Sequence, residues 1–124
     1  MEARRIAQAI GAARIAMGLG FAAAPKLARA WLGPAAQRED VGIAVRAFGV
    51  RDAVLGGLTL HTASRPQVAA RMAAMGIVVD AVDLAATVAA RRSVPATGVV
   101  LLALMAGGAI AGQAVVYREL RAAG

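Results

Sequence analysis

The chain contains no cysteine among its 124 residues, and aromatic residues make up only 3% of it. The absence of cysteine excludes disulfide bonds and thiolate metal sites. Because aromatics are scarce, Ala, Val and Leu supply most of an apolar content of 60%, and fourteen Gly residues add further small positions. Such small side chains let membrane helices pack closely against one another. We expect no metal and no cofactor.

Acidic residues are also scarce, with seven Asp and Glu against fourteen Lys and Arg, for a formal net charge of +7. A charge of this sign can indicate a nucleic-acid partner. Here, however, the basic residues flank the apolar stretches, where they would meet lipid headgroups. We therefore expect the lipid bilayer as a partner and no nucleic acid.

Long apolar stretches make up most of the sequence, and the mean hydropathy is +0.65. Four of them are found, near residues 6–24, 42–62, 68–90 and 94–117. Each is close to the ~20 residues that a helix needs to cross a bilayer. Pro25 and the segments 64–66 and 91–95 separate them. The pattern predicts one all-α domain over residues 1–124, an integral membrane four-helix bundle with four transmembrane spans.

Two segments require a choice between interpretations. The basic, then apolar N-terminus could imitate a signal peptide, but Arg14 interrupts the apolar run, so we expect a retained first helix. Residues 25–40 alternate basic and apolar side chains around Trp31. They predict either a short amphipathic segment at the membrane surface or a loop with one buried tryptophan.

Three of the four stretches carry charge at their midpoints, with Arg14 in the first, Arg51 and Asp52 in the second, and Asp80 and Asp83 in the third. A bilayer tolerates such residues only where they face protein or water and have partners. Each costs roughly 2.5 to 3.5 kcal/mol at mid-helix, whereas the apolar residues of the second stretch return only about 4 kcal/mol. The second stretch should therefore insert together with its neighbours.

Helical spacing places small residues on the same face as each charge, as in Gly11, Arg14 and Gly18. Since antiparallel neighbours align their midpoints, the charges should meet at one depth. We expect Arg14 to contact Asp80 or Asp83, and Arg46 to balance the carboxylate that remains. The predicted interior consists of Arg14, Arg46, Arg51, Asp52, Asp80 and Asp83.

Two functions fit such an interior. The first is a binding or accessory protein, in which Arg14, Arg46, Arg51 and Asp52 form the binding residues. The second is a membrane enzyme of the isomerase, cyclase or epoxide-opening type, with Asp80 or Asp83 as general acid or base on a lipophilic substrate. A third interpretation, structural pairing that only sets helix register, stays open beside both.

The chain is partly similar to other membrane protein families but lacks residues that each of them requires. Gly76 and Asp80 are similar to half of the CDP-alcohol phosphotransferase signature, but the other carboxylate motif is absent. Four-helix multidrug exporters use a glutamate where this chain has Arg14, and fluoride channels need a Thr/Phe-rich third helix. The balanced flanking charge still permits an antiparallel dimer, so a homo-oligomer is among the expected partners, as is a lipophilic small molecule.

The segment 46–52 (Arg-Ala-Phe-Gly-Val-Arg-Asp), together with Pro25, Gly33-Pro34, Gly56 and Asp80-x-x-Asp83, resembles bacterial four-helix membrane proteins that are loosely DoxX-like. This resemblance covers most of the chain and implies a four-helix membrane bundle with no established activity. The Ala- and Arg-rich, Lys-poor composition indicates a high-GC bacterium, such as an actinobacterium. We therefore expect the protein in the bacterial cytoplasmic membrane.

Overall fold

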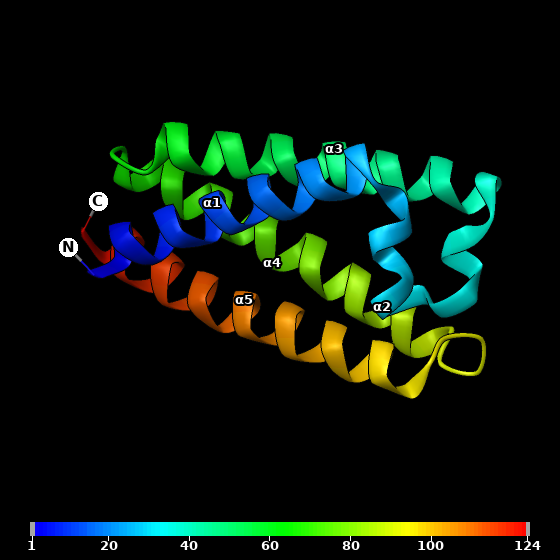
Figure 1. The fold of residues 1–124 in the computed structure, drawn as a ribbon. Coiled ribbons are helices and arrows are strands. Elements are labelled where there is room, and N and C mark those ends of the chain that lie inside the picture. The colour runs from blue at the N-terminus through cyan, green and yellow to red at the C-terminus, as the bar shows by residue number, and fades with distance from the viewer. Residues whose placement is uncertain (1, 124) are drawn as a thin grey trace.

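The computed structural model describes residues 2–123, and all of the regular structure within them is helical, which confirms the all-α class. Four long helices account for most of it (Figure 1): α1 (Glu2–Ala23), α3 (Glu39–Thr62), α4 (Pro66–Ala89) and α5 (Ala96–Ala123). A short linking segment joins α1 to α3 and consists of η1 (Pro25–Ala28), α2 (Arg29–Leu32) and η2 (Gly33–Gln37).

The helix boundaries follow from local chemistry. Pro25 follows the end of α1, and Pro66 is the first residue of α4, where its missing N–H costs nothing. Glu39 and Asp40 lie in the first turn of α3, where negative charge favours the helix dipole. Gly33 ends α2 with a φ of 70°, a backbone conformation that residues other than glycine rarely adopt.

The long helices form two close pairs, α1 with α3 and α4 with α5. Glycines bring the first pair together, because a Cβ placed on Gly11 would lie 2.9 Å from the carbonyl oxygen of Gly56. Gly18 and Gly49 face each other in the same way further along the pair. The backbones of α1 and α3 therefore touch, which small residues make possible.

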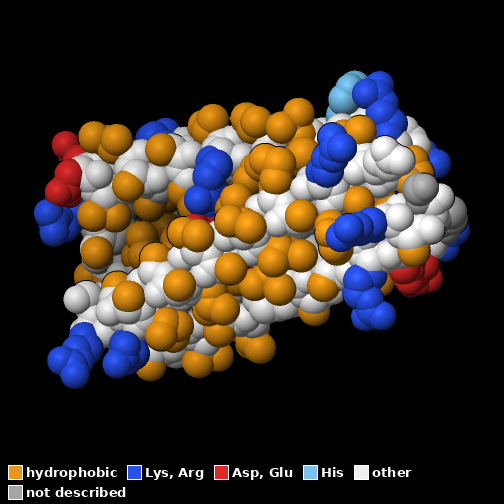
Figure 2. Space-filling model, turned by 180° about the vertical axis from the view of Figure 1, so that it is seen from behind, with side chains coloured by type: hydrophobic (Ala, Val, Ile, Leu, Met, Phe, Trp, Pro, Cys, Tyr) orange, Lys and Arg blue, Asp and Glu red, His pale blue; other side chains and the backbone are white. Residues whose placement is uncertain are grey.

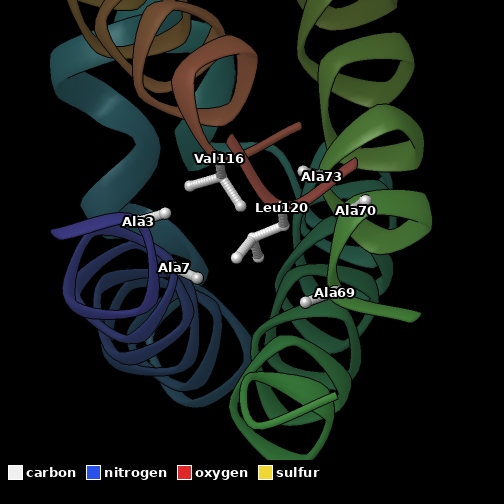
Figure 3. Close-up of a cluster of buried hydrophobic side chains, with 7 residues drawn as sticks. All are labelled: Ala3, Ala7, Ala69, Ala70, Ala73, Val116 and Leu120. Carbon is white, nitrogen blue, oxygen red and sulfur yellow. The ribbon is translucent and has the colours of Figure 1, made fainter. Parts of the chain in front are cut away.

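The two pairs meet at the end of the molecule that holds both chain termini (Figure 1). A core of small and medium side chains fills this end (Figure 3), made of Ala3, Ala7, Ala69, Ala70, Ala73, Val116 and Leu120. At the opposite end α3 and α5 lie further apart, and the linking segment lies across the gap. Gly98, in the first turn of α5, contacts the backbone of Trp31 and so allows α2 to pack closely against α5.

Three helices, α1, α4 and α5, are long and apolar enough to cross a membrane. Helix α3 is not among them, because Arg46, Arg51 and Asp52 lower its hydropathy, so the fourth span stays a prediction. Large hydrophobic side chains such as Leu104 and Val78 are more than 60% exposed. Figure 2 shows the same distribution on one face, with most Lys and Arg side chains toward the ends and hydrophobic side chains between them.

Candidate functional site

Arg14 is the centre of a buried polar cluster that joins all four long helices. Its Nη1 donates to Asp52 Oδ1 of α3 at 2.9 Å, and its Nη2 donates to Asp80 Oδ2 of α4 at 2.6 Å. All three side chains are at most 9% exposed. The expected contact of Arg14 with Asp80 or Asp83 is therefore confirmed, and Asp80 is the partner.

Gln113 of α5 completes this cluster. Its Nε2 donates to Asp80 Oδ2 at 2.7 Å and to the carbonyl of Ala109, while its Oε1 accepts from Arg14 Nη2 at 3.3 Å. Gly76 of α4 makes room for the amide, because a Cβ at that position would overlap Gln113. Asp80 thus accepts two hydrogen bonds on one oxygen.

A second ion pair lies beside the first and nearer the surface. Arg51 of α3 binds Asp83 of α4 through both Nη atoms, at 3.2 and 2.7 Å, in the two-pronged geometry typical of strong Arg–carboxylate pairs. The Arg51 guanidinium also lies 4.6 Å from the centre of the Phe48 ring. Two ion pairs therefore connect the α1–α3 pair to α4.

Arg46 does not join this interior, which corrects the expectation that it balances the remaining carboxylate. It is exposed, and its Nη1 donates to the carbonyl oxygen of Ala22 near the end of α1. Arg46 and Arg51 lie five positions apart, and that spacing turns Arg46 to the surface while Arg51 faces α4.

The cluster consequently holds fewer positive than negative groups. Arg14 and Arg51 face three carboxylates, those of Asp52, Asp80 and Asp83, which leaves one carboxylate charge unbalanced. Asp52 is the carboxylate whose hydrogen-bonding capacity is only partly used. Its side chain is 1% exposed, and its Oδ2 has no hydrogen-bond partner in the described part of the chain.

A cavity of about 420 Å³ lies next to the cluster, between the two helix pairs and beneath the linking segment. Its polar wall contains Arg14, Asp52, Asp80 and Asp83. The rest of the lining is apolar and comes from α1, η1, α2, α3 and α5: Ala9, Ile10, Ala13, Met17, Phe21, Leu27, Ala30, Trp31, Phe48, Leu101, Leu102, Met105, Ala106, Gly108 and Ala109. A volume of this size suits a drug-sized organic molecule.

Three aromatic side chains form one wall of this cavity. The Phe48 ring lies 5.2 Å from Trp31 and 5.8 Å from Phe21, both in tilted arrangements that aromatic pairs favour. Trp31 Nε1 also donates to Thr87 Oγ1 of α4 at 3.2 Å. The linking segment therefore folds against the long helices as short helical turns with a half-buried tryptophan, and Trp31 contributes to the cavity wall.

Several residues of the site were not predicted to belong to it. Gln113 is not among the residues of the predicted interior, and its place in the cluster depends on the pairing of α4 with α5. Phe48 and Trp31 are far apart in sequence, and only the folding of the linking segment brings them together. The rarity of aromatic residues could have pointed to this part of the site, because three of the four in the chain line one cavity.

Other acidic groups lie outside the cluster. Asp40 pairs with Arg38 at 2.7 Å on the surface, where hydrogen bonds from the Arg38 guanidinium lower the pKa of the Asp40 carboxyl below its usual value. Within residues 2–123, no group of three or more His, Cys, Asp and Glu side chains is arranged to hold a metal ion.

The chain matches no family model, no curated protein and no solved structure. The resemblance to DoxX-like proteins therefore stays a prediction, and function has to be argued from the site itself.

Proposed function

We propose that this protein is a small integral membrane protein that binds a lipophilic molecule in the cavity beside its paired Arg and Asp residues. One observation carries the proposal: an apolar cavity of about 420 Å³ ends on a buried polar wall. Binding sites for small organic molecules combine a mostly apolar lining with a few placed polar groups in this way. The three apolar helices support a location in a membrane, and the composition favours the bacterial cytoplasmic membrane.

The proposal can be tested with Trp31, the only tryptophan in the chain, because it lines the cavity. Bromododecane, a neutral lipophile whose bromine quenches tryptophan at short range, should quench Trp31 fluorescence in the detergent-solubilised protein. Ala106 is 5% exposed and lines the cavity, so Ala106→Leu should fill part of it and reduce the quenching.

The matched control is Ala111→Leu, an exposed position on the same helix that does not line the cavity. This variant should be quenched like the wild type, because dissolved bromododecane reaches both proteins equally through the detergent. Equal quenching of wild type and Ala106→Leu would mean that the bromoalkane does not enter the cavity, and the proposal would be wrong.

A second candidate function is a membrane enzyme that uses Asp80 or Asp83 as general acid or base, and the position of both carboxylates on the cavity wall favours it. Incubating the protein with a lipid extract and following the mixture by mass spectrometry should then reveal a product. Variants Asp80→Asn and Asp83→Asn that fold but form no product would support catalysis. Variants that do not fold would support a purely structural role for the pairs.

A further inference from the structure

The unbalanced carboxylate charge of the buried cluster constrains what the cavity binds. Two guanidinium groups face three carboxylates between the helices, and Arg46, the third basic residue of the predicted interior, is exposed. An uncompensated charge is very costly in an apolar interior, so a buried group of this kind takes up a proton or pairs with a cation. The cluster therefore needs one additional positive charge, supplied by a proton or by a ligand.

The hydrogen bonds identify Asp52 as the group that takes this charge. Asp80 accepts from both Arg14 and Gln113 through Oδ2, and Asp83 accepts from Arg51 through both oxygens, so each of these two carboxylates accepts two hydrogen bonds. Asp52 accepts one hydrogen bond on Oδ1, whereas Oδ2 is buried without a partner. Asp52 also lines the cavity, so a cation held there would lie close to its carboxylate.

The aromatic wall indicates the chemical class of that molecule. Phe21, Trp31 and Phe48 surround one part of the cavity, and Phe48 already attracts the Arg51 guanidinium at 4.6 Å. Aromatic faces attract organic cations, and more strongly where water is excluded. Negative charge and aromatic rings in one apolar cavity together favour a cation that carries apolar groups.

We propose that the cavity is a site for a lipophilic monocation, such as a tertiary amine or a quaternary onium ion, which binds in exchange for one proton on Asp52. The inference depends on the proposed function, since it names the class of molecule that the cavity holds. In the exchange the O–H bond of Asp52 breaks, the proton goes to water, and the cation replaces it as the partner of the carboxylate. Net charge in the site is the same before and after.

The exchange sets a direction for the effect of pH. Asp52 is bound by Arg14 from α1, which also binds Asp80 from α4 and Gln113 from α5, and the Arg51–Asp83 pair lies beside this group. A proton and the cation compete for the same carboxylate. Apparent affinity should therefore fall as the pH falls, by about tenfold per pH unit while Asp52 is protonated in the free protein.

The test is calorimetric titration of the solubilised full-length protein with tetraphenylphosphonium, in two buffers that differ in ionisation enthalpy. The difference between the two heats counts the protons released, and we expect about one per cation bound. Asp52→Asn should abolish both the proton release and the pH dependence. Asp40→Asn, which removes an exposed carboxyl remote from the cavity, should behave like the wild type.

Binding of tetraphenylphosphonium to the wild type without proton release, or no binding at all, would overturn this inference. The wild-type proton count decides the matter even where Asp52→Asn does not fold. The outcome also separates the two proposals. Quenching of Trp31 by bromododecane with no proton-linked cation binding would leave the proposed function standing and remove this inference alone, whereas failure of both ligands would remove both.

Discussion

At the scale of single residues, Arg14 has the largest structural role in this protein. One guanidinium group bridges carboxylates from α3 and α4 and contacts an amide from α5. Buried charges of this kind contribute little net stability over apolar residues, but removing one partner leaves the others uncompensated. Arg14 therefore belongs to a group that must be kept or removed as a whole.

Replacing Arg14 by Leu should lower the free energy of unfolding by about 3–5 kcal/mol, because Asp52 and Asp80 would both remain buried without their cation. Thermal or denaturant unfolding of the solubilised protein measures this effect. Arg46→Leu provides the control, since Arg46 is exposed and makes no ion pair in residues 2–123, and it should change stability little. Wild-type stability for Arg14→Leu would contradict the assigned role.

At the scale of elements, the close pairing of α1 with α3 depends on glycine. The backbones meet where Gly18 faces Gly49 and where Gly11 faces Gly56, and an added Cβ at any of these positions would collide with the opposite helix. The same pairing sets the depth of the ion pairs, since Arg14 and Asp52 lie between these two glycine contacts along their helices. Small residues thus position the charges as well as the helices.

Gly18→Ala should destabilise the protein by about 1–3 kcal/mol, because the methyl group has no space against the backbone of α3. Gly57→Ala is the matched control on α3, where an added Cβ meets no atom within 4 Å. That change should instead stabilise the helix by about 0.5–1 kcal/mol, as expected for alanine in a helix interior. Unfolding measurements that gave both variants the same sign would refute the proposed packing.

At the scale of the whole molecule, the two ends of the protein differ. The end with the termini is closed by an alanine-rich core, and the end with the linking segment holds the aromatic cavity (Figures 1 and 3). The α3–α4 turn with Ser64 lies at the terminal end, whereas the α4–α5 turn with Ser93 lies at the other. If all four long helices cross the bilayer, these ends face opposite sides of it.

Because the chain has no cysteine, single cysteines can report this topology directly. Ser64→Cys and Ala122→Cys should react with a membrane-impermeant thiol reagent from the same side, and Ser93→Cys from the opposite side. Labelling in intact cells and in inverted vesicles measures both sides. Reaction of Ser64→Cys and Ser93→Cys from the same side would mean that α4 does not cross the membrane.

The sequence alone determined the features that depend on neighbours along the chain. Apolar stretches bounded by prolines predicted the four long helices, and the midpoint charges predicted a polar interior with Arg14 bound to an aspartate of α4. These predictions succeeded because helical periodicity and the cost of burying charge act locally.

Only the tertiary structure decided which charged side chains pair with one another. It also decided that the helices enclose a cavity. Periodicity specifies the face on which a side chain lies but not which antiparallel neighbour covers that face, so the pairing of Arg14 with both Asp52 and Asp80, and the exclusion of Arg46, required the packed helices. The aromatic wall likewise depends on how the linking segment folds back across the long helices, because contacts between distant residues have no signature in a single sequence.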